Sequence, residues 1–482
     1  MNDQPMKSDQ KEKLDRKAKP RNEKKLKSSS KLGFMTVFAC VAIALLSFVV
    51  TTSFSANARP QPKFVPADAL KASALSTSWV CPISGAGIVS NSVVISNPDT
   101  SRTANVEISL FDSLGNKIGS EIVKVEPNSF LIRSPNSLGA KNDTSLFVDS
   151  FSAPIAVFRS LKLSDGEELL GCVNDLRSTA SFPNLTTIRN ANSTLVLSNP
   201  YDEAVVVDIN ATLITLSEGG AIPTLDDIKG QIIPAKGRLD LDLQNQFGRF
   251  DVVSVDVASR SGFFAAEALI AYSGATGSNG QTVVSAASEL ANRTQLNWAG
   301  VDPTRIIAKN GSKNTFSLNS KALATDQRSL SPEPTPIPAG TSAILENLGL
   351  DFGIRNITLE VEEGSNKANN IYAAWIHASD SAVSSGSQKG QNSKSHLVPV
   401  TSGDRLNIFN SGKKQVKITY SILGSRAVKS MTINPGIFTV VDLSELEISA
   451  ATVVQLNADR KVIVSSSNST SSRFTPSIEV LP

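Results

Sequence analysis

Histidine, the residue most often used for acid–base and metal chemistry, occurs only twice in the 482 residues, at His377 and His396. Neither has a second His or a Cys at a metal-ligand spacing. His377 follows an alternating run and His396 borders a Ser/Gly-rich segment, so we expect both to be solvent-facing strand or linker residues. Nucleophile, phosphate-loop and zinc-peptidase motifs are absent from the sequence. We therefore predict no catalytic residue, no metal site and no cofactor.

Acidic side chains offer two weaker candidates. Asp240 and Asp242, in the run RLDLDLQ, stand on one face of a predicted strand, as a glycosidase or calcium site would require. Leucines occupy the other face, and a solvated face over a buried leucine face is the reading we favour. Glu267 interrupts the apolar run FFAAEALIAY. Burial would raise its pKa, but we expect an exposed position on an edge strand.

Aromatic and asparagine side chains suggest glycan chemistry only weakly. Trp79, Trp298 and Trp375 would suit a carbohydrate-stacking platform, but the first two stand near the start of a repeated unit, where closing a core is the commoner role. The Asn-x-Ser/Thr sequons reflect a Ser/Thr-rich composition and matter only if the host glycosylates asparagine. They include Asn142, Asn184 and Asn192.

Two of the three cysteines stand in the large C-terminal part of the chain. Cys40 lies in an apolar segment and is interpreted as an apolar filler, which leaves Cys81 and Cys172 as an even pair. In an oxidising compartment such a pair favours a disulfide over two free buried thiols. The bridge would close a loop of about 90 residues and contribute roughly 4 kcal/mol in the chain-entropy model.

The N-terminus predicts how the protein is placed in the cell. Residues 1–31 hold 11 basic and 5 acidic residues with almost no apolar side chains, which is typical of a disordered tail. Residues 32–54 are uncharged, and their stretch LGFMTVFACVAIALLSFVV is close to the ~20 apolar residues that cross a bilayer as one helix. The basic flank places the N-terminus in the cytoplasm and exports the rest. A single-pass cell-membrane protein is therefore expected.

A cleaved signal peptide is the alternative to a membrane anchor. Ala56 and Ala58 have the small-x-small form of a signal-peptidase site, at the start of a stalk predicted over residues 55–78. The apolar stretch and the region before it are longer than is usual for a signal, which favours the anchor. Cleavage near Ala58 would instead give a secreted protein, and both routes deliver the remainder to the same compartment.

A repeated strand ending organises the exported part. NSVVISNP, NSTLVLSNP, a fainter TRIIAKNG and DRLNIFNS align at Asn97, Asn199, Asn310 and Asn410, which are 102, 111 and 100 residues apart. The residues two and four places before each Asn are apolar in every copy. This alternation predicts a strand with one face on a core. The residue between them varies and is Val94, Val196, Ile307 or Asn407.

A proline turn that opens another strand repeats in the same register, at Pro127, Pro234, Pro338 and Pro435. Two landmarks at a spacing of about 100 residues predict an all-β protein with four tandem immunoglobulin-like β-sandwich modules. The predicted modules cover residues 79–178, 179–295, 296–395 and 396–482. Outside the N-terminal tail the acidic residues slightly exceed the basic ones, so no nucleic-acid partner is expected.

The chain resembles a family of membrane-anchored, secreted actinobacterial proteins of unknown function. The resemblance covers roughly residues 79–300. Its landmarks are Trp79–Pro82, the strand ends Asn97–Pro98 and Asn199–Pro200, Ala153–Val157 and Gly171–Cys172. The third predicted module matches poorly and the fourth lacks the Asn-Pro form. The resemblance implies an envelope protein without an assigned activity, and a link to cell-wall glycan assembly by association alone.

These patterns favour a non-enzymatic, membrane-tethered envelope protein that presents β-sandwich modules for binding or scaffolding. The expected partners are the membrane, through one helix, and other envelope proteins or cell-wall glycan. The alternative is an extracytoplasmic carbohydrate-active enzyme or glycan-binding protein, which would require a cleft with two carboxylates at working distance.

Overall fold

The computed structural model describes residues 75–83, 90–141, 143–163, 166–217, 220–273, 279–287, 293–297, 305–324, 329–345, 348, 354–361, 371–378, 383–386, 392–468, 473–476 and 478–480. They all belong to one compact unit, Phe64–Pro482. The predicted tail, membrane helix and signal-peptidase site at Ala56 and Ala58 lie outside the described residues. Within those residues, no helix has the length and apolar character needed to cross a membrane.

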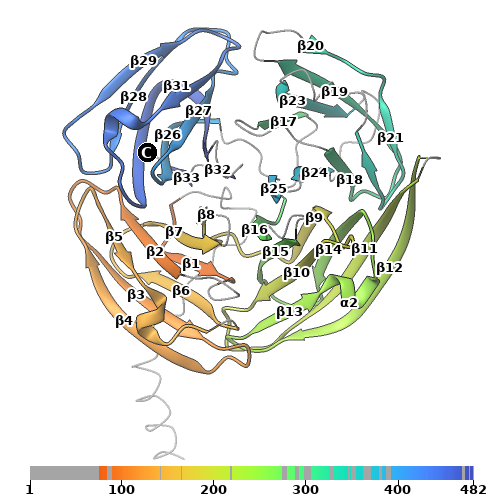
Figure 1. The fold of residues 1–482 in the computed structure, drawn as a ribbon. Helices are drawn as coiled ribbons and strands as arrows, with labels where there is room; N and C mark the ends of the chain where they lie inside the picture. Colours follow the sequence, from red (N-terminus) through yellow and green to blue (C-terminus); the bar gives the residue numbers. More distant parts are fainter. Residues whose placement is uncertain are drawn as a thin grey trace, which may run out of the picture. The chain divides into compact units, whose positions relative to one another are not determined.

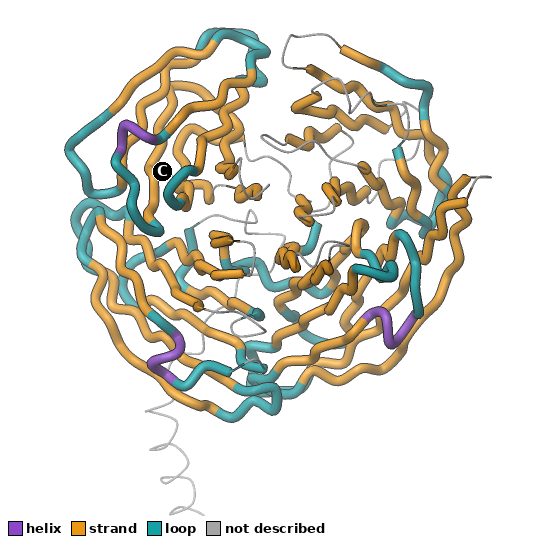
Figure 2. The backbone as a smooth tube through the Cα atoms, viewed as in Figure 1, coloured by secondary structure: helices purple, strands orange, loops and turns teal. Residues whose placement is uncertain are grey.

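The protein is all-β, with 64% of the described residues in strands and 4% in helices. Figure 2 shows strands throughout the backbone and only short helical turns between them. This confirms the all-β part of the predicted fold class. It follows from short runs of Val, Ile, Leu and Thr that alternate with polar residues, a composition suited to pleated, half-buried strands.

The strands fall into four consecutive groups, which we call modules 1 to 4 (Figure 1). They follow the four predicted modules, although the strands Arg293–Asn297 and Asn392–Val400 cross the predicted boundaries at 295/296 and 395/396, and the exact module boundaries stay a prediction. Module 1 contains β1 (Ser78–Cys81), β2 (Ser90–Asn97), β3 (Ala104–Phe111), β4 (Lys117–Val125), β5 (Ser129–Arg133), the 3-10 helix η1 (Pro135–Leu138), β6 (Ser145–Ser150), β7 (Ala156–Leu163) and β8 (Gly166–Gly171). Module 2 contains β9 (Thr179–Leu185), β10 (Ala191–Ser198), β11 (Val205–Ser217), β12 (Gly220–Ile233), β13 (Arg238–Asp242), the helix α2 (Leu243–Phe247), β14 (Val252–Ser259), β15 (Ala265–Ser273) and β16 (Asn279–Ser285).

The second half of the chain repeats this order. Module 3 contains β17 (Arg293–Asn297), β18 (Arg305–Asn310), β19 (Phe316–Ala324), β20 (Ser329–Leu330), β21 (Thr335–Ile337), β22 (Ser342–Ile344), β23 (Ile354–Val361), β24 (Ile371–Ala378) and β25 (Val383–Gly386). Module 4 contains β26 (Asn392–Val400), β27 (Asp404–Phe409), β28 (Val416–Ile422), β29 (Lys429–Ile433), β30 (Phe438–Asp442), the 3-10 helix η3 (Ser444–Leu446), β31 (Thr452–Asn468), β32 (Arg473–Pro476) and β33 (Ile478–Glu479).

Each of the first three modules has two antiparallel sheets with one strand order. In module 1 the first sheet is β1-β6-β3-β4 and the second is β5-β2-β7-β8. Module 2 repeats this as β9-β14-β11-β12 and β13-β10-β15-β16, and module 3 as β17-β23-β19-β20, with β21 also on β19, and β22-β18-β24-β25. An immunoglobulin domain places its first two strands in one sheet. Here the first strand pairs with the sixth instead, so the immunoglobulin-like assignment is not confirmed.

Module 4 follows the same order with its sixth and seventh strands fused into β31. The first half of β31 pairs with β26 and β28, and its second half pairs with β27 and β32. The strands of module 4 therefore form a single eight-stranded sheet. We call the half with β26, β28 and β29 its first sheet and the half with β27, β30 and β32 its second sheet.

Every module has its own apolar core between its two sheets. The aligned apolar positions of the second strand all lie there, as the alternation predicts. Leu195 and Leu197 belong to the core of module 2, and Leu406 and Ile408 belong to that of module 4. The corresponding pairs in modules 1 and 3 are Val93 with Ile95 and Ile306 with Ala308.

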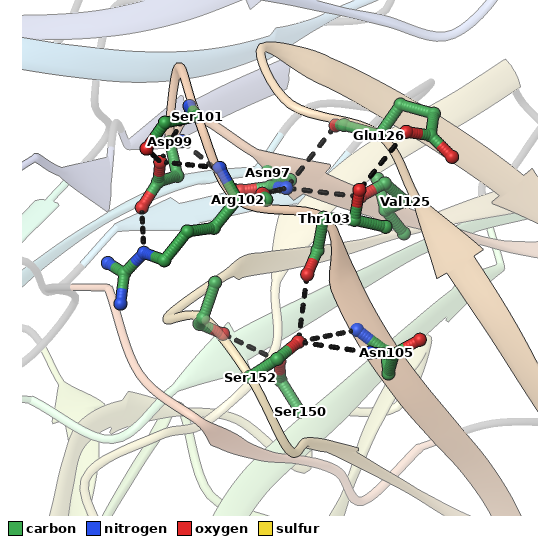
Figure 3. Close-up of polar contacts among 11 residues, drawn as sticks. Asn97, Asp99, Ser101, Arg102, Thr103, Asn105, Val125, Glu126, Ser150 and Ser152 are labelled. Carbon is green, nitrogen blue, oxygen red and sulfur yellow. Dashed lines mark hydrogen bonds and ion pairs between the residues drawn. The ribbon is translucent and has the colours of Figure 1, made fainter.

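The four aligned asparagines make the same contacts in every module. In module 1 the Asn97 amide nitrogen donates to the carbonyl oxygens of Arg102, Val125 and Glu126, at 2.7, 3.0 and 3.3 Å (Figure 3). Its side-chain oxygen accepts from the backbone N–H of Asp99 at 3.1 Å. The fully buried amide thus ties the end of the second strand to the start of the third and to the turn before the fifth.

Modules 2 to 4 repeat this arrangement, with fully buried amides. Asn199 donates to Glu203, Ile233 and Pro234, Asn310 to Asn314 and Ile337, and Asn410 to Lys414, Ile433 and Asn434. In each module, the acceptor carbonyl groups farther along the chain belong to residues at or within two positions of the proline landmark, Pro127, Pro234, Pro338 or Pro435. The repeated asparagine and the repeated proline turn of the sequence are therefore in contact. We call this contact the asparagine staple.

The turn after Asn97 is fixed by a second polar residue. Asp99 accepts from the backbone N–H groups of Ser101 and Arg102 and pairs with the Arg102 guanidinium at 2.6 Å (Figure 3). The hydrogen bond from Ser101, followed by that from Arg102, holds the pKa of Asp99 well below its usual range. This exposed loop is therefore ordered by a charge-assisted turn.

Candidate functional site

The structure contains the predicted disulfide between Cys81 and Cys172, whose Cα atoms lie 4.8 Å apart. Cys81 is the last residue of β1, and Cys172 directly follows β8. The bridge therefore links the edge of the first sheet of module 1 to the end of its second sheet. The two cysteines are 91 positions apart in the sequence, and the chain-entropy model gives the bridge about 4–5 kcal/mol.

The histidines and tryptophans form no common site among the described residues. His396 lies in β26 between β31 and β33 and is fully buried, with Nε2 3.1 Å from the Ser393 carbonyl oxygen. The expected solvent-facing position is therefore wrong for His396. Trp79 is a core residue, 1% exposed, and its indole N–H donates to the carbonyl oxygens of Ser76 and Ile155. The side chains of His377, Trp298 and Trp375 lie outside the described residues.

Two of the three named sequon asparagines lie in strands and are buried or half-buried. Asn184 is fully buried in β9. Asn192 is half-buried at the start of β10, and its side-chain oxygen accepts from the backbone N–H of Gln244. Asn142 lies outside the described residues.

The two aspartates of RLDLDLQ have separate structural roles. Asp240 forms a two-point ion pair with Arg238, with Nε–Oδ1 and Nη2–Oδ2 distances of 2.5 and 2.6 Å. Asp242 caps helix α2 by accepting from the backbone N–H of Asn245. Leu241 and Leu243 are buried, so the predicted leucine face is present. Both carboxylates are therefore accounted for by local contacts.

Glu267 is fully buried, which corrects the expected exposed edge position. It lies on β15, an inner strand that pairs with β10 and β16. Its carboxylate lies 2.5 Å from Arg159 Nη2 and accepts from the backbone N–H of Ile83 at 3.3 Å. Burial raises the pKa of Glu267, while the charge of Arg159 opposes this. The compensating charge belongs to Arg159 on β7 of module 1. The sequence around Glu267 does not indicate this partner.

This ion pair is the centre of the interface between modules 1 and 2, which we call interface 1–2. Arg159 also donates to the carbonyl oxygen of Ile83 at 2.9 Å, and Arg238 donates to those of Pro82 and Thr144 at 3.0 and 2.9 Å. Apolar residues surround these polar contacts. From module 1 they are Ile83, Leu161 and Leu170, and from module 2 they are Val196, Leu269 and Val283.

A glycine allows the two modules to approach closely. Gly115, between β3 and β4, has a φ of +89° and packs against the turn before β13. A Cβ atom on Gly115 would lie 1.9 Å from the carbonyl oxygen of Ala235. Any larger residue would therefore force this part of interface 1–2 apart.

Interface 2–3, between modules 2 and 3, repeats the arrangement with different charges. Ile214 and Val252 of the first sheet of module 2 pack with Ile307 and the partly buried Ile344 of module 3. Lys309 of β18 is 1% exposed, and its Nζ lies 2.9 Å from Asp256 of β14. Burial lowers the pKa of Lys309, and Asp256 opposes that shift.

Module 4 also contacts module 1, through interface 4–1. Leu397, Leu423 and Val453 of module 4 join the apolar cluster of module 1 that includes Val94 and Leu169. In interfaces 2–3 and 4–1, one module contributes residues of its first sheet and the other contributes the outward face of its second sheet. In interface 1–2, Arg159, Leu161 and Leu170 belong to the second sheet of module 1.

The outward faces show where the sequence prediction was incomplete. The residue between the two core positions of the second strand was expected to face away from a core. Val94, Val196 and Ile307 are instead at most 1% exposed, because each lies in an interface between modules. The aliphatic residue at this position in three of the four modules could have indicated this burial, because a strand buried on both faces has a continuous apolar sequence.

Exposed aliphatic side chains gather on the fourth and fifth strands of the modules. Seven of the eleven large apolar residues that stand exposed in the described part of the chain lie there, and we call them the edge aliphatics. These strands end their sheets, so their outer backbone groups have no strand partner in the described part of the chain. The edge aliphatics are Ile118 and Ile122 on β4, Ile132 on β5, Leu225 and Ile232 on β12, Leu330 on β20 and Val440 on β30.

Metal-ligating side chains do not cluster in the part of the chain that the structure describes. There, no group of three or more His, Cys, Asp or Glu side chains is placed to hold a metal ion. Among the described residues, the edge aliphatics are the most distinctive exposed feature.

Comparison of the sequence with models of protein families gives no match, and comparison with curated proteins gives none either. The resemblance to an actinobacterial envelope family therefore stays a prediction.

Proposed function

We propose that this chain is a non-enzymatic, membrane-tethered cell-envelope protein whose tandem β-sandwich modules bind or scaffold other envelope proteins. The observation that carries the proposal is the position of the edge aliphatics. Ile122 and Leu225 each keep 66% of their surface exposed on strands that end their sheets. Soluble proteins usually protect such edges with charges, prolines or bulges, because an unpaired edge recruits another chain.

The chemistry of these edges favours a polypeptide partner. A strand added to β4 or β12 would satisfy unpaired backbone N–H and C=O groups, and the aliphatic side chains would add apolar contact area. Lys117 and Lys124 flank the aliphatics of β4, whereas Asp226, Asp227 and Lys229 lie between those of β12. All five are exposed, so the two edges differ in net charge. This difference supports separate partners, or separate parts of one partner, at modules 1 and 2.

The remaining parts of the proposal come from the sequence. The uncharged segment 32–54 after a basic tail supports a tether with a cytoplasmic N-terminus. The disulfide in module 1 fits an oxidising compartment outside the cytoplasm. A role near cell-wall glycan assembly is supported only by the family resemblance.

Site-specific photocrosslinking in intact cells tests this proposal. A photoreactive residue placed at Ile122 or Leu225 should yield a discrete crosslinked protein species, whereas one at exposed Lys413 in the β27–β28 turn should not. An additional Ile118→Lys substitution should reduce the Ile122 product, because it introduces a charge beside the same edge. Identical products from all three positions would contradict a binding role for the edges.

A further inference from the structure

Strands β4 and β12 occupy the same place in modules 1 and 2. Each is the fourth strand of its module, and each ends the first sheet of that module without a strand on its outer side in the described part of the chain. The side chains at these edges are open to solvent, since Ile122 of β4 and Leu225 of β12 are both 66% exposed. The two edges are therefore exposed surfaces at equivalent positions of the repeat.

The outward face of β4 combines an aliphatic side chain with a positive charge. Val123 points into the core of module 1, so its neighbours Ile122 and Lys124 lie on the outward face of the sheet. Both are exposed. The other two charged residues of the strand, Lys117 and Glu121, already form ion pairs within module 1. The charge that this edge offers to a partner is therefore that of Lys124.

The outward face of β12 combines an aliphatic side chain with a negative charge. Asp226 pairs in register with Ala211, a core residue of β11, so its neighbours Leu225 and Asp227 lie on the outward face. Asp226, Asp227 and Lys229 are all exposed, which gives this edge a net negative charge. The edges of β4 and β12 are thus alike in aliphatic character and opposite in charge.

Within one chain the two strands meet at their ends. Gly115, two residues before β4, packs closely against Ala235, two residues after β12. Past this contact β4 pairs in register with β3, and β12 pairs with β11. Each strand is the last of its own sheet, so the two edges are not paired with each other. A second molecule can supply the strand that each edge lacks.

We propose that β4 of one copy of this chain pairs antiparallel with β12 of a second copy. Because the two strands are equivalent in the repeat, this pairing joins their sheets with both outward faces on the same side. Ile122 and Lys124 then lie beside Leu225 and Asp227 of the second copy, so an aliphatic side chain meets an aliphatic one and a positive charge meets a negative one. The pairing rests on the proposed binding function and names a second copy as the partner.

The irregular parts of both strands limit the length of the new ladder. Register shifts interrupt β4 before Gly119 and β12 after Ile228, which leaves 119–125 and 220–228 as regular stretches. Such irregularities restrict pairing at a sheet edge. A ladder of this length suits a contact that forms and separates. It joins two different surfaces, so two copies can pair reciprocally or many can form a row.

Crosslinking between differently tagged full-length proteins tests the pairing. In a Cys40→Ser background, one protein carries Ile122→Cys and the other carries Leu225→Cys. The two are purified in detergent, mixed and treated with a short bismaleimide. We expect a species that carries both tags, several-fold more abundant than with Lys413→Cys, at an exposed position in the β27–β28 turn, in place of Leu225→Cys.

Charge reversal tests the proposed complementarity. Lys124→Glu in the Ile122→Cys protein should lower the yield of the doubly tagged species several-fold, because it places two negative charges side by side. Asp227→Lys in the Leu225→Cys protein should restore the yield when the two variants are combined. Both positions are exposed, so both substitutions leave the cores of the modules unchanged. Failure of the second substitution to restore the yield would contradict the pairing of these two edges.

Two further results would overturn the pairing. One is a yield no higher than that of the Lys413→Cys control. The other is an equally abundant crosslink between two Ile122→Cys proteins, which would show that β4 pairs with β4. Photocrosslinking in intact cells at Ile122 or Leu225 decides the binding function separately. Products that contain only a different protein would support that function and overturn a second copy as the partner.

Discussion

Interfaces 1–2 and 2–3 each hold one ion pair between strands of two modules, but the two pairs differ in burial. In interface 1–2 both Arg159 and Glu267 are at most 1% exposed. In interface 2–3 Lys309 is 1% exposed, whereas Asp256 keeps 30% of its side chain exposed. Water solvates one partner of the second pair and neither partner of the first. The cost of breaking a charge pair should follow this difference, because it depends on whether the remaining charge can be hydrated.

The largest effect is expected from Glu267→Gln. The substitution leaves Arg159 buried without a counter-charge, which should lower the free energy of unfolding by about 3–5 kcal/mol. Urea denaturation followed by tryptophan fluorescence measures this through Trp79 of module 1. Asp208→Asn is the matched control, since its partner Arg260 keeps 53% of its side chain exposed and stays hydrated when the pair is broken. Equal destabilisation by both variants would contradict the special role of full burial.

Asn199→Ala should have the next largest effect, and it acts on module 2, which both interfaces share. It removes the asparagine staple and leaves the carbonyl oxygens of Glu203, Ile233 and Pro234 without this donor. We expect a loss of about 1–3 kcal/mol. Asn210→Ala, at an exposed position on β11, serves as the control for the change in intrinsic strand propensity from Asn to Ala. Differential scanning calorimetry should show a lowered unfolding temperature for Asn199→Ala and an unchanged one for Asn210→Ala.

Lys309→Met should change stability by less than about 1 kcal/mol in either direction. The methionine fills the buried space, and Asp256 can be hydrated once its partner is removed. If Lys309→Met lowered the free energy of unfolding as much as Glu267→Gln in the same urea experiment, partial exposure of Asp256 would not reduce the cost of breaking the ion pair. The comparison between the two interfaces would then fail.

The smallest effect is a pH dependence of opposite sign in the two interfaces. Burial raises the pKa of Glu267 above 4.5, so just above pH 4.5 the folded chain binds more protons than the unfolded chain. The free energy of unfolding should therefore fall as the pH rises through that window. Burial lowers the pKa of Lys309 below 10.5, so just below pH 10.5 the unfolded chain binds more protons and stability should rise with pH.

Each pH effect is measured as a difference from one variant. Urea midpoints of the unsubstituted chain minus those of Glu267→Gln should decrease with rising pH in the acidic window. The difference from Lys309→Met should increase with rising pH in the alkaline window. Slopes of the same sign in the two windows would contradict the assigned burial of one of these groups.

The sequence predicted much of what is local and little of what joins the modules. Asn97 and Pro127 were recognised as turn landmarks because turn chemistry depends on neighbouring residues. Their contact was not predictable, since the staple in module 1 joins positions 28 and 29 residues apart. The disulfide could be predicted because only two cysteines, Cys81 and Cys172, lie outside the apolar segment 32–54.

The interfaces depend on residues even further apart. Arg159 and Glu267 are 108 residues apart, and neither strand shows locally that the other carries its counter-charge. Glu267 was noticed only as a carboxylate in an apolar run, and Arg159 and Lys309, which end similar runs, were not considered. A charged residue in a run that is otherwise apolar on both faces is the signal that could have found all three.

The fused strand β31 gives module 4 mechanical properties that the other modules lack. In modules 1 and 2 the sixth and seventh strands are separated by chain segments 151–155 and 260–264, which allow one sheet to shift or open without the other. The 17 residues of β31 pass from the first sheet to the second without such a hinge. Tension applied to that strand is shared by the ladders of both sheets at once, and proteases find no connecting loop there to cut.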